Sequence, residues 1–245
     1  MPINAFRPLG DCIDTIDGPL IHIDNSSNVL AVAHLDYVMW SKPHISKGTI
    51  YCPQLDDRLG VWTILDLLPS IGIKPDILLT DSEENGRSTG QWFDSPKVYN
   101  WMMQFDRAGI DAVTYQYDHP TIDEMLHDWE VGYGSFSDIS TMDHLGVCGI
   151  NFGVGYHCQH SNKCYAQLTD TIGQACRFAR IWNDYRDVSI PYDDRYDDRY
   201  DDRYRHTDNL IWQCDCGEWN ELNDDYCKDC SLEQYLANRF AYDRC

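Results

Sequence analysis

The sequence predicts an α/β fold of three layers, in which helices cover both faces of a central mixed, mostly parallel sheet. A small C-terminal module rich in cysteine follows. Short apolar runs alternate with amphipathic segments between residues 20 and 185, as strands and helices do in such folds. The chain has 245 residues, 43% of them hydrophobic, which suffices for one core of this size. The composition then changes abruptly, because residues 193–204 repeat the tetrapeptide DDRY three times.

The expected strands are short apolar runs bounded by turn residues. Residues 20–24 and 29–34 are two such runs. The polar sequence NSSN between them is typical of a hairpin-like turn, which would make the two strands neighbours. Further strands are expected at residues 49–51, 75–80, 101–106, 112–116 and 147–152.

The expected helices have apolar residues at helical spacing. Residues 57–70 follow this pattern, and Asp56 or Asp57 could cap the helix. Residues 168–185 predict a long amphipathic helix. Shorter helices are expected at residues 121–130, 137–145 and 232–240.

Three segments follow from these changes in composition. The main domain is expected over residues 1–187, an acidic linker over residues 188–207, and a cysteine-rich module with a short tail helix over residues 208–245. The arginines of the repeat offset only part of its aspartate charge, and tyrosine is its only large apolar residue. The repeat is therefore expected to be solvated.

Charge and cysteine content limit the possible partners and compartment. The formal net charge is -21, and phosphate binding needs a basic face, so a nucleic-acid partner is not expected. No apolar run has the length of a signal peptide or a membrane span, which predicts a soluble, cytoplasmic protein without a membrane partner. Four of the 11 cysteines form one cluster, which favours a metal site plus free thiols over a disulfide framework. The short, acidic, tail-bearing form would suit a virus- or phage-encoded protein.

Five polar motifs lie at the ends of predicted strands or at a helix start, where ligands of α/β sheets gather. His34 closes an apolar run, and Asp36 is close enough to accept a hydrogen bond from its second imidazole nitrogen and to orient it as a metal ligand. Asp56 and Asp57 begin a predicted helix. One of these carboxylates could bridge two metal ions, and an N-cap is the structural alternative.

The third motif is the pair Glu83 and Glu84, directly after the predicted strand 75–80. Burying such charges is costly unless they are paired or bind a cation, so a solvated loop is the structural alternative. Adjacent glutamates can divide the chemistry, since one can hold a metal while the other handles the proton of a water.

The last two motifs are Asp106, which closes an apolar strand, and the histidine pair His157 and His160 in a later loop. An ion pair with Arg107 would also explain Asp106, and either histidine could be structural. Together the five motifs supply two histidines and three carboxylates, with one glutamate to spare. Zinc takes these donors, and metal pairs serve aminopeptidases.

Five motifs follow one another in the sequence: HxD at His34, DDxxG at Asp56, EExG at Glu83, then Asp106 and a late histidine. In this order they resemble the co-catalytic dizinc exopeptidases over residues 21–184. That family includes bacterial leucyl aminopeptidases, glutamyl aminopeptidases and related carboxypeptidases. The resemblance implies a zinc-dependent metallopeptidase that cleaves a peptide or amide bond with a metal-bridging water. The short interval between His34 and Asp56 leaves no room for an inserted lid domain, which implies the compact, single-domain branch.

The resemblance also implies roles for individual residues. Five side chains would bind two zinc ions: His34 and Asp106 on one, Glu84 and His160 on the other, and Asp56 on both. Glu83 would be the general base and Asp36 would orient His34. The Asp56–Asp57 peptide would be cis. The residues after His160 depart from the family's pattern, which leaves His157 open as the alternative ligand.

A second metal site is predicted near the C-terminus, where four cysteines have the spacing of a tetrahedral zinc site: Cys214, Cys216, Cys227 and Cys230. With Trp212 and Asn220, this segment resembles the Ran-binding-protein type of zinc finger, although its first pair is the shorter C-x-C. Free thiols are the alternative. Such a knuckle implies a possible protein partner or a structural cap, and the acidic surroundings argue against RNA.

The sequence therefore supports three hypotheses about function. The leading hypothesis is a dizinc aminopeptidase-type exopeptidase acting on a peptide or amide substrate. The second keeps the metal site in a dizinc deacetylase or carboxypeptidase acting on amides. The third is a catalytically inactive, hydrolase-like binding protein that docks a protein partner through its zinc knuckle.

Overall fold

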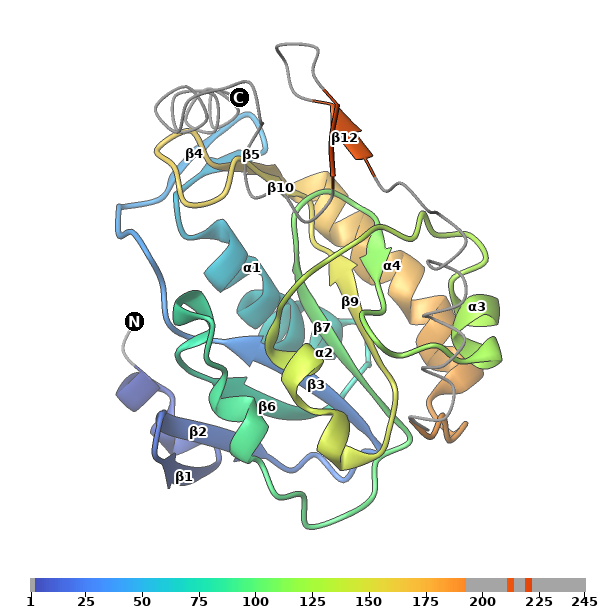
Figure 1. Cartoon of the computed structure of the whole chain (residues 1–245). Coiled ribbons are helices and arrows are strands. Elements are labelled where there is room, and N and C mark those ends of the chain that lie inside the picture. The colour runs from blue at the N-terminus through green and yellow to red at the C-terminus, as the bar shows by residue number, and fades with distance from the viewer. Residues whose placement is uncertain (1–2, 193–210, 214–218, 222–245) are drawn as a thin grey trace. The chain divides into compact units, whose positions relative to one another are not determined.

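A seven-stranded sheet forms the centre of the main unit in the computed structural model, which describes residues 3–192, 211–213 and 219–221 (Figure 1). Its strand order is β1-β2-β6-β3-β7-β9-β8. The strands are β1 Asp11–Thr15, β2 Gly18–Ile23, β3 Val29–His34, β6 Asp76–Thr80, β7 Trp101–Arg107, β8 Ala112–Val113 and β9 Gly149–Gly153. The four central strands β6, β3, β7 and β9 are parallel, and β1, β2 and β8 pair antiparallel at the two edges.

The central strands are covered on both faces. Every residue of β3, β6 and β9 is buried, which is the pattern expected of parallel strands enclosed between two layers. Because side chains alternate along a strand, Phe105 of β7 points to one face, and Gln104 and Asp106 point to the other. The expected mixed sheet between two covering layers is confirmed.

Long helices cover the face that carries Phe105. One continuous helical span consists of α1 Leu55–Trp62, the π turn η3 Thr63–Leu67 and α2 Leu68–Ser70, and α4 Leu168–Tyr185 packs against η3 on the same side. The ring of Phe178 from α4 packs against Phe105 and Phe152, with centroids 5.3 and 5.4 Å apart. Gly60 lets α1 approach β7 closely, since an added Cβ there would lie 2.2 Å from the carbonyl oxygen of Phe105.

The opposite face is covered by short helical turns instead of long helices. These turns are η5 Thr89–Trp92, η6 Asp138–Thr141 and η7 Asp143–Leu145. The helix expected over residues 137–145 is therefore two 3-10 turns, and Gly146 in the left-handed conformation ends the second. The helix expected over residues 121–130 is shorter, since α3 spans Pro120–Met125. The remaining turns of this unit are η1 Ile3–Ala5, η2 Arg7–Leu9 and η4 Glu83–Asn85.

A second, four-stranded sheet has the order β10-β11-β5-β4. Its strands are β4 His44–Ser46, β5 Thr49–Tyr51, β10 Tyr156–His157 and β11 Tyr165–Gln167. The pairing of β5 with β11 continues one residue further, where the Cys52 N–H donates to the Cys164 carbonyl at 3.1 Å. This sheet ties the segment before α1 to the loop of residues 158–164.

The expected hairpin between residues 20–24 and 29–34 is wrong. Strand β6 lies between β2 and β3, and β2 instead forms a hairpin with β1, a strand that the sequence did not predict. The residues of the supposed turn hold a different partner, because the N–H groups of Asn25 and Ser27 both donate to Asp76 Oδ1 at 2.9 Å. The carboxylate at the start of β6 therefore directs the loop away from a tight turn.

The chain divides into two compact units, Met1–Tyr196 and Asp197–Cys245. The packed chain of the first unit continues past residue 187, since Ile190 is fully buried and its N–H donates to the Asn100 carbonyl. In the second unit, β12 Ile211–Gln213 pairs antiparallel with β13 Trp219–Glu221. The DDRY repeat, the four clustered cysteines and the expected helix 232–240 lie outside the described residues. Within the described part of the chain, none of the helices combines the length and apolar character that a bilayer crossing needs.

Candidate metal centre

His34 and Asp106 meet at the carboxyl ends of neighbouring parallel strands. The register of β3 and β7 pairs Val32 with Gln104, so the residues two positions further along lie on the same face of the sheet. His34 Nε2 lies 3.1 Å from Asp106 Oδ1, and both side chains are almost fully buried. These are the two residues that the family resemblance assigns to one metal.

Asp36 links His34 to the turn that carries the two glutamates. One of its carboxylate oxygens, Oδ1, lies 3.3 Å from His34 Nδ1, and the same carboxylate accepts the backbone N–H groups of Glu83 and Glu84 at 3.2 and 3.0 Å. Burial alone would raise the pKa of Asp36, but the hydrogen bonds with His34 and these two amides lower it below its ordinary value. Asp36 is thus held as an anion in the place expected for a residue that orients His34.

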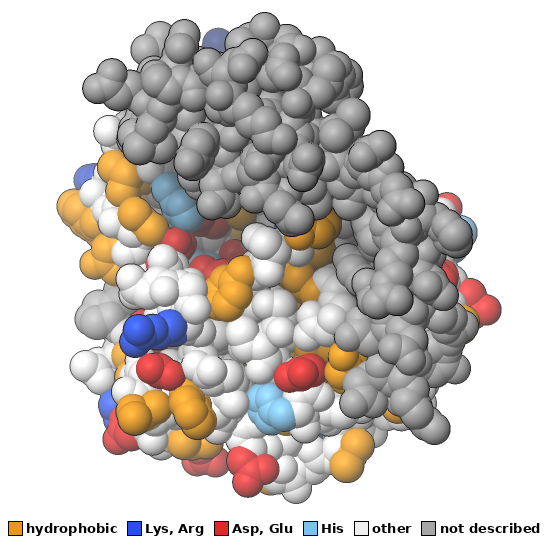
Figure 2. Space-filling model, viewed as in Figure 1, with side chains coloured by type: hydrophobic (Ala, Val, Ile, Leu, Met, Phe, Trp, Pro, Cys, Tyr) orange, Lys and Arg blue, Asp and Glu red, His pale blue; other side chains and the backbone are white. Residues whose placement is uncertain are grey.

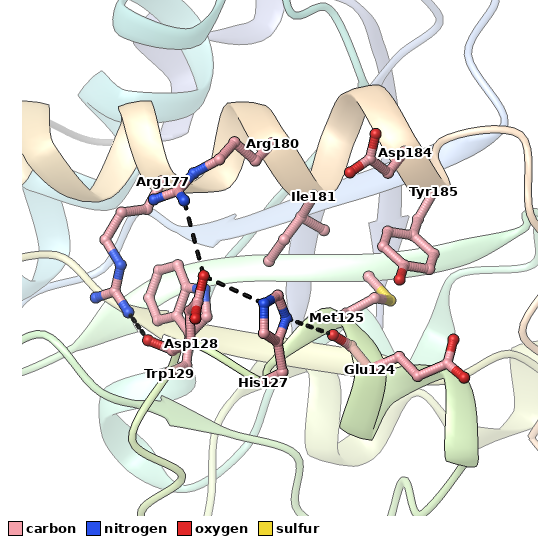
Figure 3. Close-up of a pocket in the computed structure, with 10 residues that line it drawn as sticks. All are labelled: Glu124, Met125, His127, Asp128, Trp129, Arg177, Arg180, Ile181, Asp184 and Tyr185. Atoms are coloured by element: carbon pink, nitrogen blue, oxygen red, sulfur yellow. Dashed lines mark hydrogen bonds and ion pairs between the residues drawn. The ribbon is translucent and has the colours of Figure 1, made fainter.

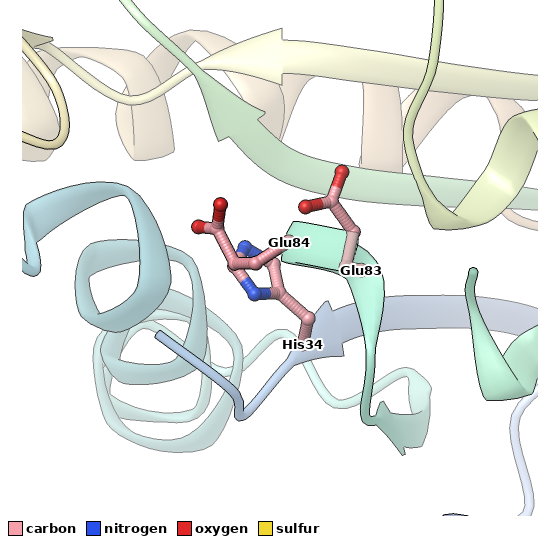
Figure 4. Close-up of side chains that lie close together, drawn as sticks. All are labelled: His34, Glu83 and Glu84. Carbon is pink, nitrogen blue, oxygen red and sulfur yellow. The ribbon is translucent and has the colours of Figure 1, made fainter. Parts of the chain in front are cut away.

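The turn η4 directs Glu83 and Glu84 towards His34 (Figure 4). Ser82, just before the turn, has a left-handed backbone with φ of 68°, which reverses the chain at the end of β6. Ligand atoms of His34, Glu83 and Glu84 all lie within 4.8 Å of one another. Burial, followed by the negative charge of Asp106, raises the pKa of Glu83 to about 9.

Asp56, Glu84 and His160 form the other half of the cluster. Asp56 lies in the first turn of α1, and His160 lies in the loop after β10, the two segments that the second sheet brings together. His160 Nε2 is 2.5 Å from Asp56 Oδ2 and 3.0 Å from Glu84 Oε1. Hydrogen bonds to these two carboxylates raise the pKa of His160 to about 10.

The two halves of the cluster act on each other electrostatically. Burial raises the pKa of Asp106, and the negative charges of Asp56 and Glu84 raise it further, although His34 opposes them. Glu84 belongs to both groups of potential ligands, so the halves share a side chain. The space-filling view shows acidic and histidine side chains side by side in a hollow of the surface (Figure 2).

The structure contradicts one expectation and separates two alternatives. Every peptide bond of the described chain is trans, including Asp56–Asp57, because both residues belong to α1, and a continuous α-helix requires trans peptides. His157 lies on β10, where its ring packs against Tyr165 with centroids 5.1 Å apart. His160, not His157, is the histidine that reaches the carboxylates.

The chemistry of these donors fits divalent cations. Four carboxylates and two histidines converge at the ends of β3, β6 and β7 and the start of α1. So many buried negative charges are costly together unless cations balance them. Imidazole nitrogen and carboxylate oxygen are donors that zinc accepts. The fit applies to each half separately, since each pairs one histidine with carboxylates.

Three buried polar residues beside the cluster were missed by sequence reasoning: Gln104, Asp138 and Asn151. Asn151 Oδ1 accepts the backbone N–H of Asp106 at 3.0 Å, and Gln104 donates to the Asp106 carboxylate at 3.0 Å. Gln104 and Asn151 each interrupt an apolar strand, a signal that could have found them. Asp138 had no such signal, because it follows in a separate turn. Burial raises its pKa to about 6.

A pocket of about 200 Å³ lies away from this cluster, between α3 and α4 (Figure 3). Trp129 and Ile181 line it, and the Arg177 guanidinium lies 3.8 Å from the centre of the Trp129 ring. None of the predicted metal ligands lines this pocket. The candidate centre is thus defined by its side chains and not by this cavity.

No family model matches the sequence, and no curated protein matches it by sequence comparison. Solved structures do match. Aminopeptidase PepT from Bacillus cereus superposes with a TM-score of 0.53 at 11% identity, covering 73% of this chain and 90% of the other. A tripeptidase from Staphylococcus aureus gives 0.53 at 12%, covering 73% and 89%. An aminopeptidase from the archaeon Desulfurococcus kamchatkensis gives 0.50 at 12%, covering 73% and 86%. The chain therefore has the mixed α/β fold of these three structures.

Proposed function

We propose that this protein is a dizinc peptidase of the aminopeptidase type. The observation that carries the proposal is the convergence of His34 with Asp106 and of His160 with Asp56 and Glu84, beside the partly buried Glu83. The solved structures with this fold that are named as aminopeptidases and a tripeptidase support a peptide substrate. The ligands would be the five that the family resemblance implies, and Asp56 would be the one that serves both cations.

The chain's own residues would divide the work of hydrolysis. When bound, the two cations supply Lewis-acid chemistry that polarises the scissile carbonyl and makes a water easier to deprotonate. Glu83 takes the proton from the attacking water and later delivers it to the leaving amine, so that the proton is conserved across the reaction. Asp36 holds His34 in its orientation throughout.

The direct test is hydrolysis of aminoacyl chromogenic substrates with and without a chelator. We expect activity that a chelator abolishes and zinc restores. The Glu83→Gln variant keeps the shape of the side chain but cannot accept the proton, so it should lose activity by at least about 100-fold while still binding zinc. Full activity in this variant would contradict the proposed role of Glu83.

The same assay separates the alternative hydrolases. A panel of peptides with free and with blocked N-termini distinguishes an aminopeptidase from a carboxypeptidase or deacetylase, because only the first requires a free amine. Activity restricted to blocked or acetylated substrates would replace the aminopeptidase proposal while keeping the metal centre.

We also propose that the four C-terminal cysteines hold a third, structural zinc. In the sequence, Cys214 and Cys216 stand between the residues of β12 and those of β13, which pair with each other. Metal analysis of the full chain should give about three zinc ions. A content of about one would favour the inactive binding protein instead.

A further inference from the structure

One buried amide stands between two buried carboxylates behind the candidate centre. Gln104 Nε2 donates to Asp106 Oδ2 at 3.0 Å and to Asp138 Oδ2 at 2.9 Å. Gln104 and Asp138 have no exposed surface at all. Both N–H bonds of this amide are therefore used on carboxylates, one of which is a proposed metal ligand and one of which is not.

The hydrogen-bond partners determine which way the Gln104 amide points. Its Oε1 accepts the backbone N–H of Ile139 at 3.3 Å. A flipped amide would place its oxygen against two carboxylate oxygens and its NH2 against that N–H, so every contact would be repulsive. The orientation with Nε2 towards Asp106 is thus the one that the surroundings allow.

Asp138 is itself held from the far side. Ser88 Oγ donates to Asp138 Oδ1 at 2.5 Å and accepts the N–H of Gly90 at 2.9 Å, as the N-cap of η5. A chain of hydrogen bonds thus connects four side chains from η5 through η6 to β7, in the order Ser88, Asp138, Gln104 and Asp106. Each member except Asp106 is fully buried.

This chain fixes the direction of the Asp106 carboxylate. Gln104 occupies Oδ2, while Oδ1 faces His34 Nε2 at 3.1 Å. Outer partners of this kind orient metal ligands and tune their affinity. A buried carboxylate stabilises a fold less well than an apolar side chain of the same volume, so stability alone does not account for Asp138.

We propose that Asp138 is a positioning residue that acts through Gln104 to raise the cation affinity of the half-site formed by His34 and Asp106. The inference rests on the proposed function, because it assumes that cations bind there. The other half-site is held from different elements, since His160 in the loop after β10 bonds to both Asp56 on α1 and Glu84 on η4. The effect of Asp138 should therefore be greater for the cation at His34 and Asp106 than for the other cation, which is coupled to it through Asp56 and Glu84.

Zinc titration of the metal-free full chain tests this selectivity by calorimetry. All samples carry Cys214→Ser and Cys216→Ser, so that the cysteine cluster takes up no zinc. In Asp138→Asn we expect one of the two dissociation constants to weaken by about tenfold, at the lower end of the range for a removed outer partner, while the other changes by much less. Gln104→Met should weaken the same constant by more. Asp143→Asn, an exposed acid on η7, is the matched charge control and should change neither constant.

The double variant distinguishes action through Gln104 from a direct effect of charge. If Asp138 acts through the amide, Asp138→Asn adds nothing once Gln104 is Met. Additive losses would overturn the proposal, and so would equal weakening of both constants, which general destabilisation produces. If Asp138→Asn does not fold, Ser88→Ala replaces it: removing the bond that holds Asp138 from the far side should weaken the same constant, and an unchanged constant would overturn the proposal.

The outcomes also separate this inference from the function on which it rests. The inference alone would be overturned if the protein with Asp138 binds two cations and hydrolyses peptides, and Asp138→Asn gives the same dissociation constants. If the protein with Asp138 binds no pair of cations, both the inference and the proposed function would be overturned. Excess zinc should restore the activity of Asp138→Asn, because a positioning residue changes occupancy and takes no part in the reaction.

Discussion

At the scale of single residues, the choice between two nearby histidines depends on backbone conformation. Cys158 and His160 both have left-handed backbones, with φ of 58° and 53°. Non-glycine residues rarely adopt this region, and such positions often mark functional sites. The loop turns His160 towards Asp56 and Glu84 and leaves His157 in the second sheet.

A matched pair of variants tests this choice. His160→Gln should lose one cation and most activity, because it removes the imidazole that contacts both carboxylates. His157→Gln should keep both cations, since its ring only packs against Tyr165. Zinc content and hydrolysis of an aminoacyl substrate are measured for both. Loss of a cation in His157→Gln, with none in His160→Gln, would reverse the assignment.

The pKa of His160 predicts how metal binding depends on pH. Hydrogen bonds to Asp56 and Glu84 raise this pKa to about 10, so the metal-free protein holds a proton that zinc must displace. Zinc affinity should therefore rise with pH by about tenfold per unit for each proton released, up to a pH of about 10. Competition with a chelator between about pH 6.5 and about pH 8.5 measures the slope.

The protonation of His160 has the opposite effect on the stability of the metal-free protein, which should fall as the pH rises. The folded-state pKa of His160 lies above its ordinary value of 6.5, so its ion pairs stabilise the fold fully below about pH 6.5. This contribution is lost as the pH rises through about 10. In the chelator competition, a zinc affinity that does not change with pH would show that His160 is already neutral in the metal-free protein.

At the scale of elements, the position of α1 on β7 places Asp56. Gly60 lies one turn after Asp56 and contacts the backbone of β7, where an added Cβ would lie 2.2 Å from the Phe105 carbonyl oxygen. That contact leaves no side chain that could move aside, so only displacement of the helix relieves it. The metal centre and the helix–sheet packing are thus coupled through one glycine.

Two glycine substitutions test this coupling. Gly60→Ala should destabilise the fold by about 1–3 kcal/mol and weaken zinc binding, because α1 must shift away from β7. Gly173→Ala is the control, since nothing lies within 4 Å of a Cβ on that helical residue. It should stabilise the fold by about 0.4–1 kcal/mol and leave zinc binding unchanged. Denaturant unfolding and zinc titration give both quantities, and a neutral Gly60→Ala would contradict the packing.

At the scale of the whole molecule, the packed part of the first unit extends beyond residue 187, the boundary expected from the sequence. Ile190 is fully buried, Pro191 bridges Val147, and the ring of Tyr192 packs against Tyr117 at 5.2 Å. The residues after the expected boundary at 187 thus belong to the core of the first unit. A cut before them removes side chains that pack in this core.

The effect of C-terminal truncation on stability should therefore differ sharply between chains that end at Val188 and at Tyr192. A chain that ends at Tyr192 should keep its peptidase activity and both cations of the main centre, while a chain that ends at Val188 should unfold at a lower temperature. Losing the burial of Ile190 alone costs about 1.5–3 kcal/mol. Thermal unfolding and aminoacyl hydrolysis of both chains are compared. Loss of activity in the longer chain would mean that residues 193–245 contribute to the active site.

Short-range patterns in the sequence determined most of the elements and the candidate side chains. Helix α4 matches its predicted limits, because its apolar residues recur at helical spacing along one face. The strands β3 and β6 were equally clear, since they are buried on both faces and therefore continuously apolar. Polar residues at or just after the ends of β3, β6 and β7 stood out against the apolar runs, which is why His34, Glu83 and Asp106 could be named from the sequence.

Tertiary structure alone decided what depends on partners distant in the chain. The place of β6 between β2 and β3 follows from the contacts of Asp76 with Asn25 and Ser27, which no local pattern encodes. The nearness of His160 to Asp56 depends on a second sheet of very short strands, and the role inferred for Asp138 depends on an amide held from two other elements. A sequence determines periodicity and residue chemistry locally, whereas hydrogen bonds between distant segments exist only once the chain has folded.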